Sequence, residues 1–369
     1  KMNGFTKGRD RSFHFGTQAH RIVGMISHLG PQLGIADGIA LANLLKQEEL
    51  ATLVFTGDGG ASEGDFHESL NVAAVWNLPV IFCVENNSWG LSTPSEEQFK
   101  CKQFIDKGIG YGMEAVQMDG NNILEVIRTV RKITSEIRKS PKPVLLEAMT
   151  FRMRGHEESS GTKYYPEGLQ DEWAIKDPLS NYEEFLKEEG VLTDEIESEY
   201  RKELKDEIQS SFDMAQNEPL ISSDEDKEEA DVFAPYTQNV IEGKGQQTEI
   251  RFIDAIQQAL NQSMERYPDL ILMGQDIAEY GGAFKVTEGL VDSYGKGRVR
   301  NTPLCESAII GAGLGLSIKG MKAMVEMQFA DFVTCGFNQI INNLAKIHWR
   351  WGQNADVVVR MPTGAGTAA

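Results

Sequence analysis

The sequence lacks any apolar run approaching the roughly 20 residues of a membrane-spanning helix, so we expect no membrane segment. Cysteine is scarce, and the four residues (Cys83, Cys101, Cys305 and Cys335) are widely spaced and form no CxxC pair. This spacing argues against a zinc site or a disulfide framework and predicts buried, reduced thiols in a cytoplasmic setting. No G-x-G-x-x-G motif follows a predicted strand, which argues against a nicotinamide-binding fold.

Positive charge is also in deficit. The chain has 36 Lys and Arg against 55 Asp and Glu, a net charge of −19. Residues 183–231 alone hold 19 acidic and 5 basic residues. This composition argues against a nucleic-acid partner. We interpret the stretch as a solvated helical face followed by a linker, rather than as an acidic docking surface.

What is present is enough apolar sequence for two domain cores, with 41% hydrophobic residues in 369. We expect an α/β fold of two doubly wound parallel-sheet modules: residues 1–217 with a helical tail, an acidic linker over 218–247, and a second module over 248–369. In the tail we expect helices over 183–189 and 194–216. Their inward apolar residues would be Phe185, Leu186, Ile196, Tyr200, Leu204 and Ile208.

The first module is organised around a strand, a glycine turn and a second strand. Residues 52–55 are apolar and β-branched, which predicts a strand buried on both faces. Gly57-Asp58-Gly59-Gly60 then permits a sharp turn, and a helix and another strand lead to Asn87, 29 residues after Asp58. Asp58 and Asn87 therefore follow neighbouring parallel strands, where open α/β sheets bind ligands. Their oxygens, with a nearby backbone carbonyl, suit Mg²⁺, and the turn offers N–H groups to phosphates.

This Gly-Asp-Gly to Asn-Asn unit resembles the signature of thiamine-diphosphate enzymes. Gly57 to Asp65 and Val84 to Pro94 are similar to the α subunit of the decarboxylating component of 2-oxo acid dehydrogenase complexes. The resemblance implies thiamine diphosphate and Mg²⁺ as cofactors. It assigns the metal to Asp58, Asn87 and Trp89, and cofactor contacts to Gly57, Asp58, Gly59, Gly60, Glu85 and Asn87.

Three further positions carry over from the resembled α subunits. Ser27 would offer a polar contact to the aminopyrimidine, and Leu29 would be an apolar wedge that bends the coenzyme, although Leu29 also fits an ordinary core position. His156 follows a predicted strand and matches a histidine near the diphosphate and the incoming 2-oxo acid. Branched-chain relatives bind K⁺ through a threonine where this chain has Pro31, so K⁺ binding stays open.

The second half resembles the β subunit of the same family, so that both subunits would be joined in one chain. The run from Val299 to Gly315 carries the likeness, and within it Glu306 matches the glutamate that hydrogen-bonds the aminopyrimidine and promotes loss of the thiazolium proton. A helix-terminal carboxylate stabilised by the helix dipole is the alternative reading of Glu306. Phe332 matches an aromatic residue near the pyrimidine, and a core phenylalanine is the alternative there.

The resemblance implies oxidative decarboxylation of a 2-oxo acid, with a branched-chain acid favoured over pyruvate. The acyl group would pass to a lipoyl domain on the acyltransferase core, and a homodimer is expected. A scaffold module that keeps the fold without turnover is the alternative of another class. Because the family's amino-terminal Tyr-Arg pair and carboxy-terminal His-Ser-Gln segment are missing, we also expect these residues to be part of a longer protein.

Overall fold

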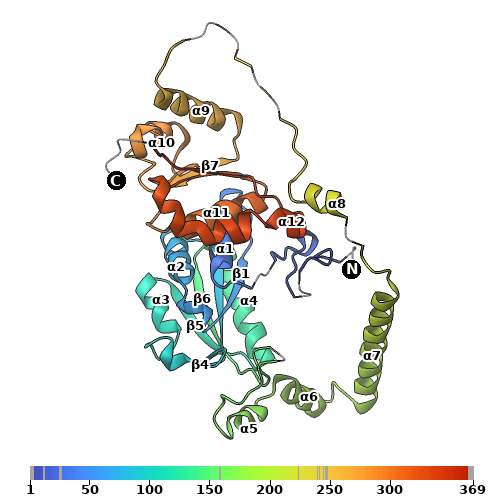
Figure 1. Ribbon diagram of the computed structural model, residues 1–369. Helices are drawn as coiled ribbons and strands as arrows, with labels where there is room; N and C mark the ends of the chain where they lie inside the picture. Colours follow the sequence, from blue (N-terminus) through green and yellow to red (C-terminus); the bar gives the residue numbers. More distant parts are fainter. Residues whose placement is uncertain are drawn as a thin grey trace.

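The computed structural model describes residues 4–10, 13–24, 27–157, 159–222, 224–238, 240, 242–243, 245 and 248–364. Its two principal sheets are parallel and each has four strands, which confirms the predicted α/β class (Figure 1). Across the residues that the structure describes, no helix combines the length and apolar character that crossing a bilayer requires.

The first sheet has the strand order β1-β2-β6-β5. Its strands are β1 (Thr52–Gly57), β2 (Val80–Asn86), β5 (Glu114–Asp119) and β6 (Val144–Met149). Helices α1 (Pro31–Leu45) and α2 (Gly64–Trp76) share a core with one face, and α4 (Ile123–Lys139) shares a core with the other. The α4 helix forms because its apolar residues recur at helical spacing, and it begins where the Asn122 side chain caps its first turn.

Strand β1 departs from the prediction of a strand buried on both faces. It lies at the edge of the sheet, and Leu53 and Phe55 are 43% and 52% exposed. The buried side chains of β1 face α1 and α2, whereas the core beneath α4 is built from β2, β5 and β6. A short apolar run fits a central strand and a half-covered edge strand equally well, and only the packing separates them.

The second sheet has the order β10-β9-β7-β8. Its strands are β7 (Leu270–Gly274), β8 (Val299–Asn301), β9 (Lys322–Glu326) and β10 (Val357–Arg360). The accompanying helices are α9 (Phe252–Arg266), α10 (Leu290–Tyr294), α11 (Glu306–Ile318) and α12 (Ile347–Trp351). Because α11 is buried from Ser307 to Ser317, it needs an apolar partner on every side.

One of those partners is α1 of the first domain. Figure 1 shows α11 crossing α1 between the two sheets, and a single hydrophobic core contains residues of both helices. A Cβ atom on Gly38 would collide with the backbone of Ala312, and one on Gly315 would collide with the carbonyl of Ile35. The two helices therefore approach at backbone distance, which only glycine permits at these points.

An acidic side chain is buried on α1 without a hydrogen-bond partner. Asp37 has no exposed surface, and neither of its carboxylate oxygens is hydrogen-bonded. Burial raises the pKa of Asp37 well above its usual value of 3.8. Since the folded state then binds this proton more tightly than the unfolded state, stability falls as the pH rises from the usual value through the raised one.

Replacing Asp37 with alanine is therefore expected to stabilise the fold. We expect Asp37→Ala to raise the free energy of unfolding by about 1–3 kcal/mol near neutral pH, because it removes an unsatisfied buried group. The gain should be larger at about pH 7 than at about pH 5, closer to the usual pKa, which denaturant titrations at both values can measure. An equal gain at the two values would show that the buried carboxyl does not titrate as described.

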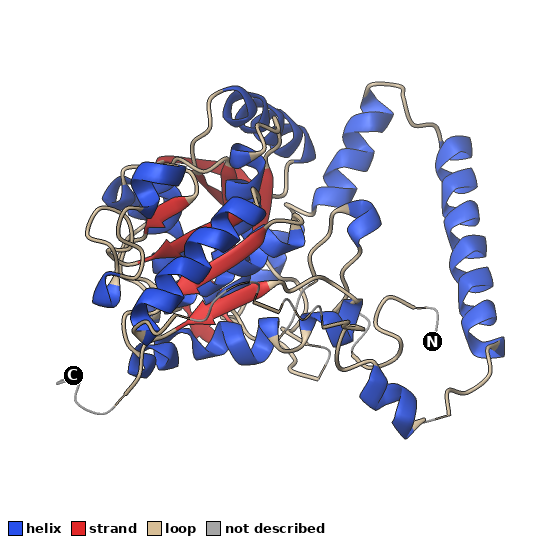
Figure 2. Ribbon diagram, turned by 90° about the horizontal axis from the view of Figure 1, so that it is seen from above, coloured by secondary structure: helices blue, strands red, loops and turns tan. Residues whose placement is uncertain are grey.

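The tail of the first domain contains α5 (Leu169–Ala174), α6 (Pro178–Glu188) and α7 (Asp194–Asn217). The predicted helices are present, but the expected inward packing of their apolar residues is wrong for α7. Tyr200 and Leu204 are each 58% exposed, and Figure 2 shows α7 standing away from the body of the chain. The residue spacing indicates that one side of the helix is apolar. It does not indicate that another part of this chain covers that side.

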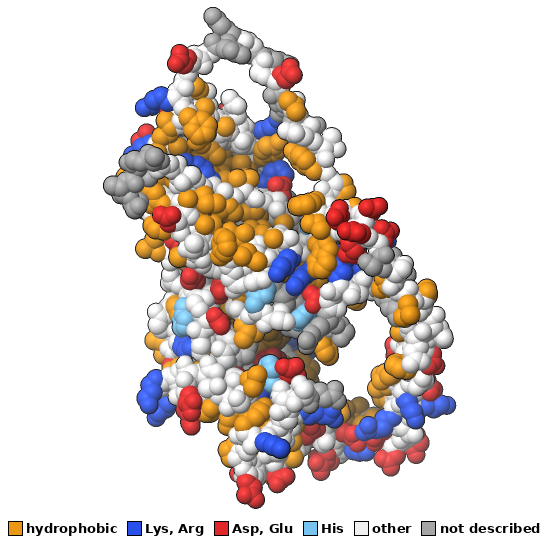
Figure 3. All heavy atoms as spheres, in the orientation of Figure 1, with side chains coloured by type: hydrophobic (Ala, Val, Ile, Leu, Met, Phe, Trp, Pro, Cys, Tyr) orange, Lys and Arg blue, Asp and Glu red, His pale blue; other side chains and the backbone are white. Residues whose placement is uncertain are grey.

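The acidic linker includes a short helix, α8 (Glu225–Ala230), over which Figure 3 shows acidic side chains gathered. Glu228 forms an ion pair with Arg9 at 2.8 Å, and Asp231 forms ion pairs with both Arg9 and Lys7. These contacts tie the linker to the N-terminal segment. The boundaries 1–217, 218–247 and 248–369 themselves stay a prediction.

Candidate active site

Asp58 and Asn87 lie at the same edge of the first sheet, as the strand order requires. The parallel pairing of β1 and β2 sets Gly57 opposite Glu85, so both chains leave the sheet at this level. Asp58 is only 2% exposed, and its Oδ2 accepts a hydrogen bond of 2.6 Å from the Ser95 hydroxyl. The Asn87 side-chain oxygen accepts from the backbone N–H of Trp89 at 3.0 Å.

A buried carboxylate on the neighbouring strand β6 holds the end of β2. Glu147 on β6 is fully buried, and its Oε1 accepts a hydrogen bond of 2.7 Å from the Asn86 side chain. Its Oε2 accepts from the backbone N–H of Phe104 at 3.0 Å and from the Gln117 side chain at 3.1 Å. The Glu147 carboxylate accepts hydrogen bonds from four donors, of which the backbone N–H of Ile105 is the fourth. These bonds compensate the cost of burying the carboxylate. Glu147 thereby holds the residue before Asn87.

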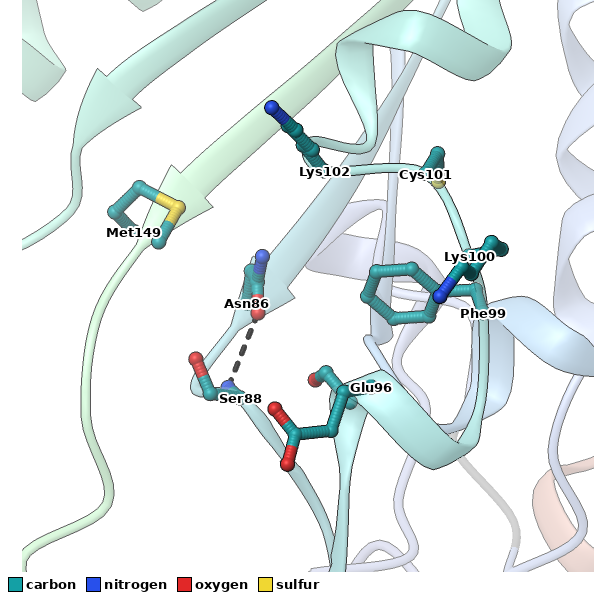
Figure 4. Close-up of a pocket in the computed structure, with 9 residues that line it drawn as sticks. Asn86, Ser88, Glu96, Phe99, Lys100, Cys101, Lys102 and Met149 are labelled. Atoms are coloured by element: carbon teal, nitrogen blue, oxygen red, sulfur yellow. Dashed lines mark hydrogen bonds between the residues drawn. The ribbon is translucent and has the colours of Figure 1, made fainter.

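A cavity of about 360 Å³ adjoins this edge, and Figure 4 shows the residues around it. Asn86 and Ser88 line it from the end of β2, and Met149 lines it from the end of β6. Ser95 is common to this cavity and to the hydrogen bond with Asp58. The cavity therefore opens directly beside the predicted metal edge.

The glycine turn packs tightly on both of its neighbours. A Cβ on Gly59 would come within 3.0 Å of the Gly90 Cα, in the hairpin of β3 (Trp89–Gly90) and β4 (Thr93–Pro94). A Cβ on Gly60 would lie 2.6 Å from the Thr56 hydroxyl and 3.7 Å from Leu29, whereas Gly57 has open space. Leu29 is 52% exposed, so it does not occupy an ordinary core position. An apolar side chain is thus presented beside the turn.

Glu306 is the first residue of α11 and is half-buried. Its Oε1 accepts a hydrogen bond of 3.0 Å from the side chain of Gln275, which follows β7 and is itself buried. The helix begins at Glu306, so its unpaired N–H groups favour the carboxylate there. Both readings of Glu306, as a helix-terminal carboxylate and as a proton-sharing group, are compatible with this position.

Two further carboxylates, from α2 of the first domain, reach the start of α11. The Ser307 hydroxyl donates to Asp65, and Glu68 accepts from the backbone N–H of Ala308 at 3.0 Å. Burial raises the pKa of both acids; for Glu68 the neighbouring charges of Asp65 and Glu306 raise it further. A Cβ on Gly30, next to Leu29, would approach Asp65. The contacts therefore run from the glycine turn through Leu29 and α2 to the first turn of α11 within one chain.

His156 lies on the loop after β6, at the same end of the first sheet as Asp58. Its Nδ1 is 3.1 Å from the Arg152 guanidinium, and Arg152 also donates to the backbone carbonyl of Leu91. The histidine is exposed. The structure thus attaches His156 to the loop that follows Asn87.

Three other predicted residues, Glu85, Trp89 and Phe332, lie on different elements. The Glu85 side chain is exposed at the end of β2. Trp89 pairs with Pro94 in the hairpin and packs edge-on against Tyr165. Phe332 lies in a 3₁₀ turn, is 38% exposed and packs edge-on against Phe329, so it is not a fully buried core residue.

The first domain offers a donor set that fits a hard cation. The described residues contain no cluster of three or more His, Cys, Asp or Glu side chains that could hold a metal. A cation at this edge would therefore take Asp58 with the Asn87 amide oxygen and a backbone carbonyl, leaving positions for phosphate and water, as Mg²⁺ does. The glycine turn and the exposed Leu29 suit the other parts of a phosphorylated cofactor.

Several supporting residues were not predicted from the sequence: Ser95, Glu147, Gln275, Asp65 and Glu68. Glu147 had a detectable signal, because a lone acid within an otherwise apolar strand needs buried partners. The acids of α2 had none, since a polar helix face gives no indication of which helix it will contact.

Comparison with known proteins gives two family matches that divide the chain. Residues 1–223 match the "Dehydrogenase E1 component" family, and residues 248–369 match the "Transketolase, pyrimidine binding domain" family. The first half is 38% identical over 226 residues to the 2-oxoisovalerate dehydrogenase subunit alpha of Bacillus subtilis, which covers 59% of this chain and 68% of the relative.

Two other relatives are more distant. The 3-methyl-2-oxobutanoate dehydrogenase subunit alpha of Mycobacterium tuberculosis is 35% identical over 188 residues, which are 49% of this chain and 51% of the relative. The pyruvate dehydrogenase E1 component subunit alpha of Rhizobium meliloti is 30% identical over 220 residues, which are 59% of this chain and 63% of the relative. The chain thus spans about half to two thirds of the length of these relatives.

Proposed function

Because the chain belongs to the dehydrogenase E1 component family, we propose that it decarboxylates a branched-chain 2-oxo acid and passes the acyl group to a lipoyl group of its acyltransferase partner. Family membership implies thiamine diphosphate as the cofactor. The observation that supports the proposal is the packing of α1 and α2 on α11, because Asp65 and Glu68, which follow the glycine turn in the chain, contact the first turn of the helix that begins at Glu306.

Each group at this interface has a role in the proposal. Asp58, Asn87 and the Trp89 carbonyl would hold Mg²⁺, and the Gly57–Gly60 turn would receive the diphosphate. Leu29 and Phe332 would support the rings, with Ser27 and Glu85 as polar neighbours. Thiamine diphosphate, when bound, supplies the carbon nucleophile and the electron sink for decarboxylation.

Protons would be handled by two residues of the chain. Glu306, oriented by Gln275 through its Oε1, would share a proton with the cofactor, and a half-buried site makes such sharing stronger than it is in water. His156 would face the incoming acid from the loop after β6, held by Arg152. A branched-chain substrate is favoured because the 2-oxoisovalerate dehydrogenase subunit alpha of Bacillus subtilis matches at 38% identity, against 30% and 33% for the pyruvate relatives of Rhizobium meliloti and Bacillus subtilis.

A direct assay tests the proposal. The full-length protein should decarboxylate 3-methyl-2-oxobutanoate faster than pyruvate with an artificial electron acceptor, and only when thiamine diphosphate and Mg²⁺ are added. Asp58→Asn should lower this rate about 100-fold or more, because it removes a charged metal ligand. The matched control Glu136→Gln, on α4 and with a side chain 41% exposed, should leave the rate unchanged.

The other outcomes of this assay are equally informative. Faster turnover of pyruvate would assign the chain to the pyruvate branch. No turnover of either acid by the folded, cofactor-supplied protein would reject the enzyme and favour the scaffold alternative.

A further inference from the structure

A hydroxyl, an imidazole and a carboxylate are joined by hydrogen bonds in the segment next to the proposed site. The Ser27 Oγ is 3.1 Å from Nε2 of His14, and Nδ1 of the same ring is 2.8 Å from Oδ1 of Asp10. All three residues belong to the N-terminal segment that precedes α1. A base within hydrogen-bond reach of a hydroxyl and oriented by a third group is the arrangement that activates a nucleophile or moves a proton.

The chemistry of the three groups fixes where the protons lie. An ionised carboxylate can only accept, so Nδ1 of His14 carries the proton in its contact with Asp10. In the neutral ring Nε2 is then an acceptor, and the Ser27 hydroxyl donates to it. The Arg350 guanidinium of α12 lies 3.4 Å from the other oxygen of Asp10, which favours the ionised carboxylate.

The second domain holds this array in place. The side chains of His14 and Asp10 are only 13% and 15% exposed, so water competes little for their hydrogen bonds. The Trp351 indole donates to the His14 carbonyl at 3.3 Å, and a Cβ on Gly24 would collide with the same indole. Figure 1 shows the N-terminal segment beside α12. The geometry of the array therefore depends on the docking of the two domains.

Ser27 lies at the end of this array that faces the site. It is exposed, and the chain continues from it to Leu29, which packs beside Gly60, and to Gly30, which packs beside Asp65. A proton accepted or released by the Ser27 hydroxyl is thus exchanged close in the chain to the residues that pack beside the glycine turn and Asp65.

We propose that Asp10, His14 and Ser27 form a proton relay, in which Nε2 of His14 removes the proton of the Ser27 hydroxyl and returns it at the rim of the proposed site. The destination of the proton rests on the proposed function. The reactivity that the relay gives to Ser27 does not, because it requires only that the folded protein holds Asp10, His14 and Ser27 within hydrogen-bond reach of one another.

Diisopropyl fluorophosphate tests that reactivity on the full-length protein without cofactor. In the labelling step the Ser27 oxygen bonds to phosphorus, fluoride leaves with the electron pair of the P–F bond, and the hydroxyl proton goes to His14. Peptide mass spectrometry should locate the label on Ser27, and Ser27→Ala should abolish it. His14→Gln should slow labelling about 100-fold or more, as expected on loss of a general base.

The matched control is His20→Gln, because His20 is an exposed histidine of the same segment outside the relay; it should label at the wild-type rate. Asp10→Asn should also slow labelling, by at least about tenfold, since it disturbs the ring orientation and tautomer. Thermal unfolding of each variant identifies any loss of rate that comes from misfolding. One folded variant, of His14 or of Asp10, is enough to test the relay. Wild-type labelling rates in folded His14→Gln, or no label on Ser27 in the wild type, would overturn the relay.

The labelling and decarboxylation assays separate the two proposals. Labelling that depends on His14 in a protein that turns over neither acid would retain the relay and reject the proposed function. Turnover without such labelling would do the reverse. If both hold, His14→Gln should also lower kcat, and His20→Gln should not.

Discussion

Replacing Glu306 with glutamine is expected to lower the rate of 2-oxo acid decarboxylation by about 100- to 10,000-fold, the usual range for loss of a positioned acid–base group. Glutamine has nearly the same shape, and its amide oxygen can still accept the hydrogen bond from Gln275. It cannot, however, hold and release a proton. The variant therefore separates the proton-sharing role of Glu306 from a purely structural role at the start of α11, and steady-state turnover measures the difference.

A second effect of the same variant, a change in the pKa of Glu68, does not depend on turnover. The charge of Glu306 is one of the causes that raise the pKa of Glu68, so Glu306→Gln should lower that pKa and leave the fold at least as stable. Glu279→Gln is the matched control, because Glu279 lies in the same domain and is paired with Lys296 on the surface. Wild-type turnover in Glu306→Gln would reduce Glu306 to a helix-terminal carboxylate.

Gly38→Ala is expected to cost about 3 kcal/mol of stability, the upper part of the usual range for overpacking, because the added methyl group meets a backbone and not a flexible side chain. The Cβ would collide with Ala312 on α11, and neither helix backbone can yield without moving its sheet. Since α11 carries Glu306 at its first turn, the displacement should also weaken cofactor binding. Denaturant unfolding and a fluorescence titration with thiamine diphosphate measure the two effects.

Gly110→Ala provides the control for this prediction. Gly110 is also helical, near the end of α3 (Ile105–Tyr111), but a Cβ there would meet nothing within 4 Å. Alanine favours a helix over glycine by about 1 kcal/mol, so this variant should be neutral or slightly more stable. Equal stability of both variants would show that α1 and α11 are not in backbone contact in solution.

Local pattern was sufficient for most of the elements. The strand expected over 52–55 corresponds to β1, the strand expected before Asn87 corresponds to β2, and the helices expected over 183–189 and 194–216 correspond to α6 and α7 within a few residues. All four thiols are free as expected, and Cys83 and Cys305 are buried, but burial was wrong for Cys335, which is exposed, and only half right for Cys101, which is half-buried. The roles of the candidate site residues, in contrast, stay predictions.

The same kind of pattern was misleading where burial depends on a distant partner. Leu53 and Phe55 belong to a continuous apolar run, as in a strand buried on both faces, yet one face of β1 is open. Tyr200 and Leu204 are spaced as an inward helix face, yet α7 stands free. An apolar side chain indicates that burial is favourable, but it does not specify what supplies the covering surface.

By itself the sequence determined the glycine turn, the positions of Asp58 and Asn87 after parallel strands, and the family, because these follow from short-range spacing that strand geometry enforces. Only the tertiary structure decided that α1 meets α11 at backbone distance, that Asp65 and Glu68 reach the start of the helix that carries Glu306, and that Arg350 stands behind Asp10. Those contacts join residues more than two hundred positions apart, and they depend on the complementary shapes of two cores, which no local pattern encodes.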